Sequence, residues 1–152
     1  MRLSTRSRYG VRALCALAAL SDGRRPVPIA RLSEHEDISR QYLALLFYEM
    51  KRAGLVDAVR GYNGGYRLAK KSSEITVASV VRALEGPIAP VECLMSEGVA
   101  GPGDCRRKAH CLSRPAWSRL QRQIEAALES VTIASLVTRG NPEVEDPGAQ
   151  DH

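Results

Sequence analysis

The sequence is short of several features that would mark common classes of protein. No apolar run approaches the ~18 residues that cross a bilayer, so we expect no membrane partner. The first residues lack a long apolar segment and a small-residue cleavage site, which predicts a cytoplasmic protein. No phosphate-binding glycine fingerprint follows a strand, and no paired carboxylates or Ser/His/Asp set stand out. We therefore expect a protein that is not an enzyme.

Charge is unevenly distributed along the 152 residues. The formal net charge is +5, and 44% of the residues are hydrophobic, enough for an ordinary core. Residues 1–70 contain 13 Lys and Arg against 6 Asp and Glu, whereas residues 71–152 contain 9 against 11. Such a basic N-terminal part favours a polyanionic partner, either nucleic acid or an anionic membrane, although a merely solvated basic face has the same composition.

Residues 1–85 show the element order of a winged helix-turn-helix, which predicts a mainly α fold with a small β-hairpin wing. A first helix is expected from about Arg6 to Leu20 after an N-cap at Ser4, and a second over Ile29–His35. Ser39 is a good N-cap for a third helix, which Gly54 ends. Two short strands, Val56–Arg60 and Tyr66–Ala69, then flank a glycine-rich turn.

The third helix has the composition of a helix that enters the major groove of DNA. Polar residues occupy its N-terminal turn, and apolar ones behind them seat it in the core. Arginine pairs well with guanine and glutamine with adenine, while an arginine at the hairpin tip suits a narrow minor groove. The residues predicted to bind DNA are Arg2, Arg8, Ser39, Arg40, Gln41, Tyr42 and Arg60. A winged helix used only for protein contacts is the alternative.

Residues 86–114 form a glycine- and proline-rich loop that contains three of the four cysteines, Cys93, Cys105 and Cys111. Thiols gathered in a loop bind an iron–sulfur cluster or a soft metal, or form a disulfide on oxidation. Zinc is a rival to a cluster, but the spacing lacks the short Cys-x2-Cys unit that zinc modules favour. The fourth cysteine, Cys15, falls in an apolar helix and is expected to be a core residue.

Residues 115–140 are predicted to contain a long helix that begins near Pro115 and a short terminal helix. Trp117, Leu120, Ile124 and Leu128 belong to an apolar stripe at three- and four-residue steps. That stripe must pack either on the first domain or on a second copy of the chain. Residues 141–152 are polar and are expected to form a disordered tail.

Four segments together give a specific resemblance to the IscR-type family of bacterial transcription regulators, also called the Rrf-two family. These are M-R-L-S followed by R-Y-G-V-R-A-L, then I-S-R-Q-Y-L-A-L-L-F, G-L-V-D-A-V-R-G-Y-N-G-G-Y-R-L-A and C-L-S-R-P-A-W. The resemblance implies a homodimer held by the long C-terminal helix and bound to double-stranded DNA at a palindromic operator. It also implies a repressor controlled by a 2Fe–2S or 4Fe–4S cluster or by redox state. Under it, Cys93, Cys105 and Cys111 are the cluster ligands, Gln41 and Tyr42 read bases, and Arg60 enters the minor groove.

The sequence departs from the family pattern at four places. Eleven residues separate Cys93 from Cys105, more than the family usually has. The positions that supply a fourth ligand in some members are Arg114 and Arg8 here, so neither known fourth ligand carries over. Ala44 replaces a polar residue of the reading helix. A regulator without a cluster (a thiol switch or a zinc protein) and a redox or interaction module that does not bind DNA remain the alternatives.

Overall fold

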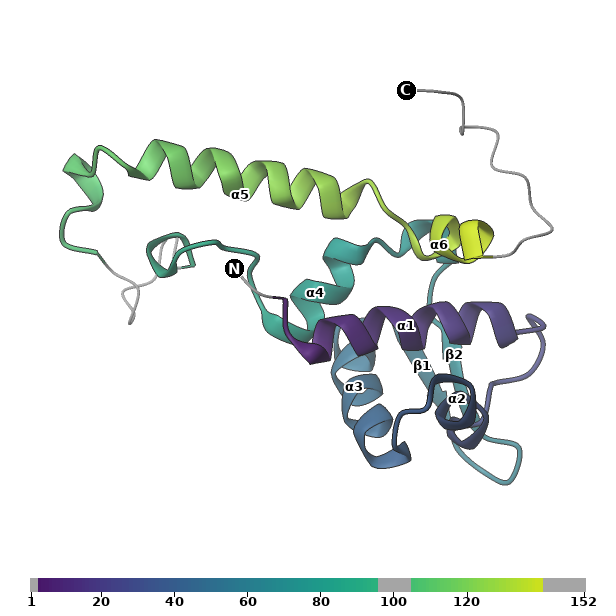
Figure 1. Ribbon diagram of the computed structural model, residues 1–152. Coiled ribbons are helices and arrows are strands. Elements are labelled where there is room, and N and C mark those ends of the chain that lie inside the picture. The colour runs from purple at the N-terminus through teal and green to yellow at the C-terminus, as the bar shows by residue number, and fades with distance from the viewer. Residues whose placement is uncertain (1–2, 96–104, 141–152) are drawn as a thin grey trace.

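The computed structural model describes residues 3–95 and 105–140. In that part of the chain two antiparallel strands lie among helices, and the long helix α5 extends above the rest of the molecule (Figure 1). The elements, in chain order, are α1 (Thr5–Leu20), α2 (Ile29–Glu36), α3 (Arg40–Arg52), β1 (Val56–Val59), β2 (Gly65–Leu68), the 3-10 helix η1 (Ser72–Glu74), α4 (Val77–Glu85), the 3-10 helices η2 (Glu92–Leu94) and η3 (Lys108–His110), α5 (Arg114–Glu129) and α6 (Ile133–Gly140). The predicted winged helix-turn-helix is confirmed. The residues assigned to the tail, 141–152, lie outside the described part.

Hydroxyl side chains start three of the helices, two of them at the N-caps that the sequence predicted. Ser4 accepts a hydrogen bond from the backbone N–H of Arg6, and Ser39 accepts one from that of Tyr42, each at 3.2 Å. Thr76 caps α4 in the same way. Each cap satisfies a backbone donor that the first helical turn leaves without a partner, which fixes where the helix begins.

The hairpin is joined to the helical part through its second strand. Strands β1 and β2 pair from Val56 opposite Leu68 to Val59 opposite Gly65. Val27, in the connection between α1 and α2, exchanges two backbone hydrogen bonds with Tyr66, at 2.8 and 2.9 Å. This close approach requires glycine at position 65, because a Cβ atom there would lie 2.3 Å from the carbonyl oxygen of Val27. The base of the wing therefore has a fixed place beside α2.

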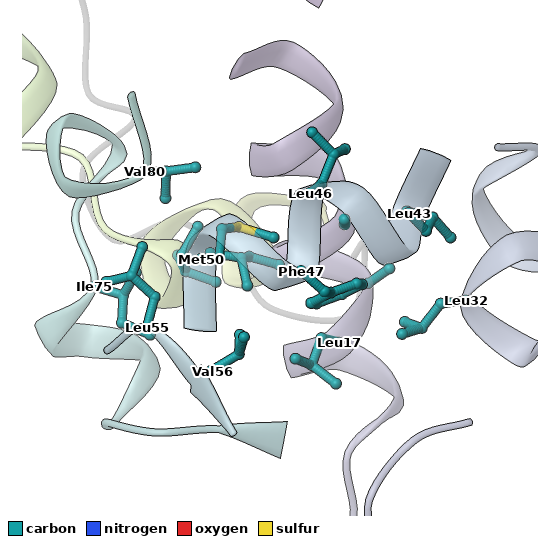
Figure 2. Packing of buried hydrophobic residues seen from close by; sticks show 14 of the residues in the cluster. Leu17, Leu32, Leu43, Leu46, Phe47, Met50, Leu55, Val56, Ile75 and Val80 are labelled. Atoms are coloured by element: carbon teal, nitrogen blue, oxygen red, sulfur yellow. The ribbon is translucent and has the colours of Figure 1, made fainter. Parts of the chain in front are cut away.

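One hydrophobic core holds α3 against α1, α2, α4 and the hairpin. Leu43, Leu46, Phe47 and Met50 form the buried face of α3, and all four are fully buried (Figure 2). The Phe47 ring stacks on Tyr66 of β2, with ring centroids 4.3 Å apart. Because these four buried residues all lie on one side of α3, the opposite side of the helix is left for contacts outside the core.

The C-terminal helices pack back on the first domain. Ile133 of α6 is fully buried in the same core, and its N–H donates to the carbonyl of Ile75 at 2.9 Å. The N–H of Val77 donates to the carbonyl of Val131 at 2.9 Å. The domain predicted as residues 1–85 therefore shares its core with α6. Within the described part, no helix is long and apolar enough to cross a membrane.

Helix α5 is only partly covered. Ile124 and Leu128 pack on a small cluster formed by Ala78, Val81 and Ile88, while Trp117 and Leu120 each remain 40% exposed. On the polar side, the Arg82 guanidinium pairs with Glu129 and lies 3.6 Å from Glu125. The apolar stripe thus meets the first domain at its C-terminal half, and its N-terminal half is left open.

Candidate DNA interface and cysteine segment

The N-terminal turn of α3 presents polar side chains to solvent. Ser39, Arg40 and Gln41 are all exposed, and Ser39 also caps the helix. Neither Arg40 nor Gln41 forms an ion pair or side-chain hydrogen bond within the described residues, so their donors and acceptors are available. A bidentate arginine or glutamine at this place in a helix can read a base edge in the major groove.

Tyr42 is held differently from its neighbours. Its ring is half-buried against the core and meets Tyr9 of α1 edge-on, with centroids 6.0 Å apart. The Arg12 guanidinium lies over the Tyr9 ring, 5.1 Å from its centroid. The ring of Tyr42 thus fixes α3 to α1, which leaves its hydroxyl end as the part that can meet a phosphate.

Two further residues share the outer face of α3, and sequence reasoning missed both. Leu45 is 48% exposed and Tyr48 is 59% exposed, which is unusual for large apolar side chains. They follow Gln41 by four and seven residues, so helical periodicity places all three on one face. An apolar side chain there can contact the methyl group of thymine. The signal that could have found them is the same spacing that identified the buried face.

The wing carries Arg60 at the end of β1, where it is exposed. A groove of about 540 Å³ separates the wing from α2 and α3, and Lys51 and Arg60 are among its lining residues. The tip of the wing is Tyr62, a fully exposed ring that sequence reasoning did not single out. Arg60 is therefore exposed at the side of the wing and available for contacts outside the chain.

The structure describes one of the two N-terminal arginines that are predicted to bind DNA. Arg8 is exposed on α1. Arg2 lies outside the described residues. The start of α1 is itself anchored, because the Glu85 carboxylate at the end of α4 accepts hydrogen bonds from the N–H and hydroxyl of Ser4 and from the hydroxyl of Ser7. Burial opposes ionisation of Glu85, but these hydrogen bonds outweigh it and hold its pKa below the ordinary value.

The three loop cysteines flank the segment 96–104, which is not described. Cys93 is half-buried in η2 next to Leu94, which is buried. Cys105 is exposed just before η3, and Cys111 directly follows that 3-10 helix. The Arg114 guanidinium, at the start of α5, donates to the carbonyl of Cys93 at 3.4 Å. This contact brings the backbone at Cys93 and the chain just after Cys111 side by side.

Cys111 lies in surroundings that favour its thiolate. The Ser113 hydroxyl is 3.3 Å from its sulfur. Hydrogen bonds from Ser113, and after them the backbone N–H and positive charge of Arg114, lower the pKa of Cys111. Cys15 contrasts with it: the side chain packs against the core, and burial, with the nearby Glu36 carboxylate, raises its pKa. Cys15, which was predicted to be a core residue, is half-buried at the edge of the core.

The donor chemistry suits a thiolate-bound centre, since Cys93, Cys105 and Cys111 are all free thiols. The three thiols are not close together, however. Among the described residues, no three His, Cys, Asp or Glu side chains are close enough to one another to hold a metal ion. The assignment of these three cysteines as ligands therefore stays a prediction, as does the fourth ligand.

Comparison with known proteins places the chain in a family. The profile of the Rrf2 family, described as "Iron-dependent Transcriptional regulator", matches residues 3–139. The chain belongs to the Rrf2 family. One relative is the HTH-type transcriptional regulator IscR of Photobacterium profundum, which is 38% identical over 152 residues, covering 99% of this chain and 83% of the relative. The IscR of Escherichia coli O1:K1 / APEC is 36% identical, covering 100% of this chain and 88% of the relative.

Solved structures of other members share the fold. The structure titled as CymR (YrzC), the global cysteine regulator of B. subtilis, superposes with a TM-score of 0.72 at 29% identity and covers 93% of this chain and 99% of the other. The IscR of T. potens gives a TM-score of 0.71 at 28% identity, covering 97% and 94%. The predicted family and fold are confirmed, and this Rrf2 chain is a DNA-binding transcriptional regulator.

The contrasting thiols give a first testable result. In reduced, metal-free protein we expect iodoacetamide to modify Cys111 faster than Cys15, because the thiolate is the nucleophile and the pKa of Cys111 is lowered whereas that of Cys15 is raised. Ser113→Ala should slow the reaction at Cys111, while the exposed Ser73→Ala should not. Peptide mass spectrometry over a time course measures both rates. Equal rates for Cys111 and Cys15 would contradict the assignment.

Proposed function

We propose that this Rrf2 regulator is a homodimeric repressor of a palindromic operator, and that an iron–sulfur cluster or the redox state of Cys93, Cys105 and Cys111 sets its DNA affinity. The observation that supports it best is that the cysteine segment is connected directly to the start of α5. Cys111 is two residues from Ser113, the N-cap of α5, and the Arg114 guanidinium also holds the carbonyl of Cys93. A change in the conformation of the cysteine segment would therefore shift the start of α5.

The open half of α5 supports the homodimer. Trp117 and Leu120 lie one helical turn apart and remain exposed on the apolar stripe. A second copy of the same helix can bury such a stripe. A dimer made through α5 would set the separation of the two α3 helices, which must lie about 34–36 Å apart to enter successive major grooves on one side of the duplex.

The residues have separate roles in this proposal. Arg40 and Gln41 read base edges, Arg60 enters the minor groove, and Arg8 contacts phosphates. The cluster, when bound, would supply iron that small oxidants can reach, and its thiolate ligands would come from the three loop cysteines. Ligation of the three cysteines to one centre would then fix the start of α5, and with it the spacing of the reading helices.

The test compares protein with and without the cluster. Protein purified without oxygen is expected to be brown, with charge-transfer absorption near about 400 nm. An operator selected from random duplexes with this protein then serves in gel shifts before and after cluster removal. We expect about a 5- to 150-fold difference in affinity, the range of typical allosteric coupling. Equal affinity in both forms would contradict control by a cluster.

The fourth cysteine provides a matched control. Cys93→Ala, Cys105→Ala and Cys111→Ala should each abolish the colour and the difference in affinity, whereas Cys15→Ala should keep both. A colourless protein that contains zinc favours the zinc alternative.

A thiol switch is a second candidate, supported by the lowered pKa of Cys111. A colourless, metal-free protein whose affinity changes when a disulfide forms favours that switch over a cluster.

A further inference from the structure

A strongly basic surface lies beside the wing, and none of its residues belongs to the interface described above. We define this flank surface by residues on three segments: the connection after α1, helix α2 and the end of β2. Its members are Arg24, Arg25, Arg31, Arg67, Lys70 and Lys71. All six are exposed.

The flank surface is hollowed in two places that share one residue. A cavity of about 330 Å³ is lined by Arg24, Arg25, Arg67, Lys70 and Lys71 among others. A second, also of about 330 Å³, is lined by Arg25 and Arg31 together with Tyr62 and Asn63 of the wing tip. Arg25 therefore joins the two hollows into one basic track that begins at the tip of the wing.

Few anions offset this charge. Arg67 lies 3.5 Å from Asp57 across the hairpin. Among the described residues, no other member of the flank surface forms an ion pair. The Asp22 carboxylate is occupied by the backbone N–H groups of Arg24 and Arg25, at 2.8 and 2.9 Å. Likewise, the Glu74 carboxylate accepts the backbone N–H of Lys71. Six cations thus lie near three carboxylates. The excess positive charges repel one another, and a bound polyanion would offset this repulsion.

We propose that the flank surface binds the DNA backbone beyond the outer end of each operator half-site. This inference rests on the proposed function. The connection after α1 lies on the side of the hairpin away from α3, and α5 extends from the core on the side of α3 (Figure 1). In a dimer formed through α5, the flank surfaces therefore lie at the two outer ends of the bound duplex, past the wings.

Duplex DNA suits this surface better than a protein does. Stable protein interfaces have a buried apolar or aromatic anchor at their centre. The hollow next to β2 offers only Ala18 and Leu68 for that purpose. Leu20, Val27 and Tyr62 are among the residues that line the second hollow, but Val27 is already buried in the core and the Tyr62 ring is fully exposed. A duplex carries one negative charge per about 1.7 Å of its axis, which matches a track of exposed cations and requires no shaped pocket. The track is also continuous with the tip of the wing, which the proposed function places against DNA.

The test uses two duplexes, one trimmed to the selected operator and one extended by about one turn at each end. Arg25→Ala combined with Lys71→Ala should bind the trimmed duplex as the wild type does. On the extended duplex it should bind more weakly, and the slope of log affinity against log salt should fall by about 0.9 for each phosphate that the variant no longer neutralises. Arg119→Ala combined with Arg139→Ala removes the same charge at exposed positions on α5 and α6, away from α3 and the wing, and should match the wild type on both.

The outcomes separate this inference from the proposed function. If the wild type binds the operator but the flank variant keeps its full affinity and salt slope on the extended duplex, the inference is wrong and the repressor proposal stands. If the variant weakens equally on both duplexes, the surface contacts the half-site itself, which also overturns the inference. If the wild type selects no operator, both fail. Melting temperatures should be equal for all variants, because exposed substitutions change stability by only about 0.5 kcal/mol or less.

Discussion

Phe47→Ala is expected to lower the free energy of unfolding by about 3–5 kcal/mol, the usual cost of deleting a buried ring. The side chain is fully buried and stacks on Tyr66, so the substitution removes the stacking that joins α3 to the wing as well as core volume. Domains are stable by about 5–15 kcal/mol in total, so much of the margin disappears. For a chain of this size the melting temperature should fall by roughly 6–20 °C.

Tyr62→Ala is the matched control, because it removes an aromatic ring from the same wing at a fully exposed position. Its melting temperature should stay within the small range typical of surface substitutions. Both variants are compared with the wild type at one protein concentration, since the stability of a dimer depends on concentration. Equal melting temperatures for Phe47→Ala and the wild type would contradict the assignment of this core.

Local features of the fold could be predicted from the sequence because each depends on residues close together in the chain. The caps at Ser4, Ser39 and Thr76, the glycine after α3 and the buried face of that helix all follow from spacing and side-chain chemistry. These signals are local, since a helix start needs only one acceptor within three residues. The order and spacing of these elements then predicted the winged helix-turn-helix, and the family resemblance added the dimer and the cysteine-bound cluster as expectations.

Contacts between distant segments could not be predicted in the same way. Nothing near Ile133 indicates that it is buried beside Ile75, because an apolar residue in a short helix packs equally well in many places. The pairing of Val27 with Tyr66, and of Glu85 with Ser4, also joins residues far apart in the chain. The exposure of Leu45 and Tyr48, in contrast, follows from helical spacing, since both lie on the face of α3 opposite its buried residues.

Two substitutions in the interface should weaken DNA binding in different ways. Gln41→Ala should reduce discrimination among bases by about 1–3 kcal/mol, or roughly 5- to 150-fold, because it removes a bidentate contact to one base. Arg60→Ala should lower affinity for all operators that share a narrow minor groove, since its contact depends on potential and groove width. Fluorescence anisotropy on a set of operators with single base changes measures both effects.

The pattern across that set distinguishes base reading from phosphate attraction. Gln41→Ala should flatten the preference at one position in each half-site and leave the salt dependence nearly unchanged, because the substitution removes no charge. Arg60→Ala should keep the order of preference and reduce the salt slope by roughly 2 for a dimer, about 0.9 for each arginine. Arg139→Ala removes an exposed charge from α6, distant from α3 and the wing, and should do neither. If both interface variants bind every duplex as the wild type does, α3 and the wing are not the surfaces that this regulator uses to bind DNA.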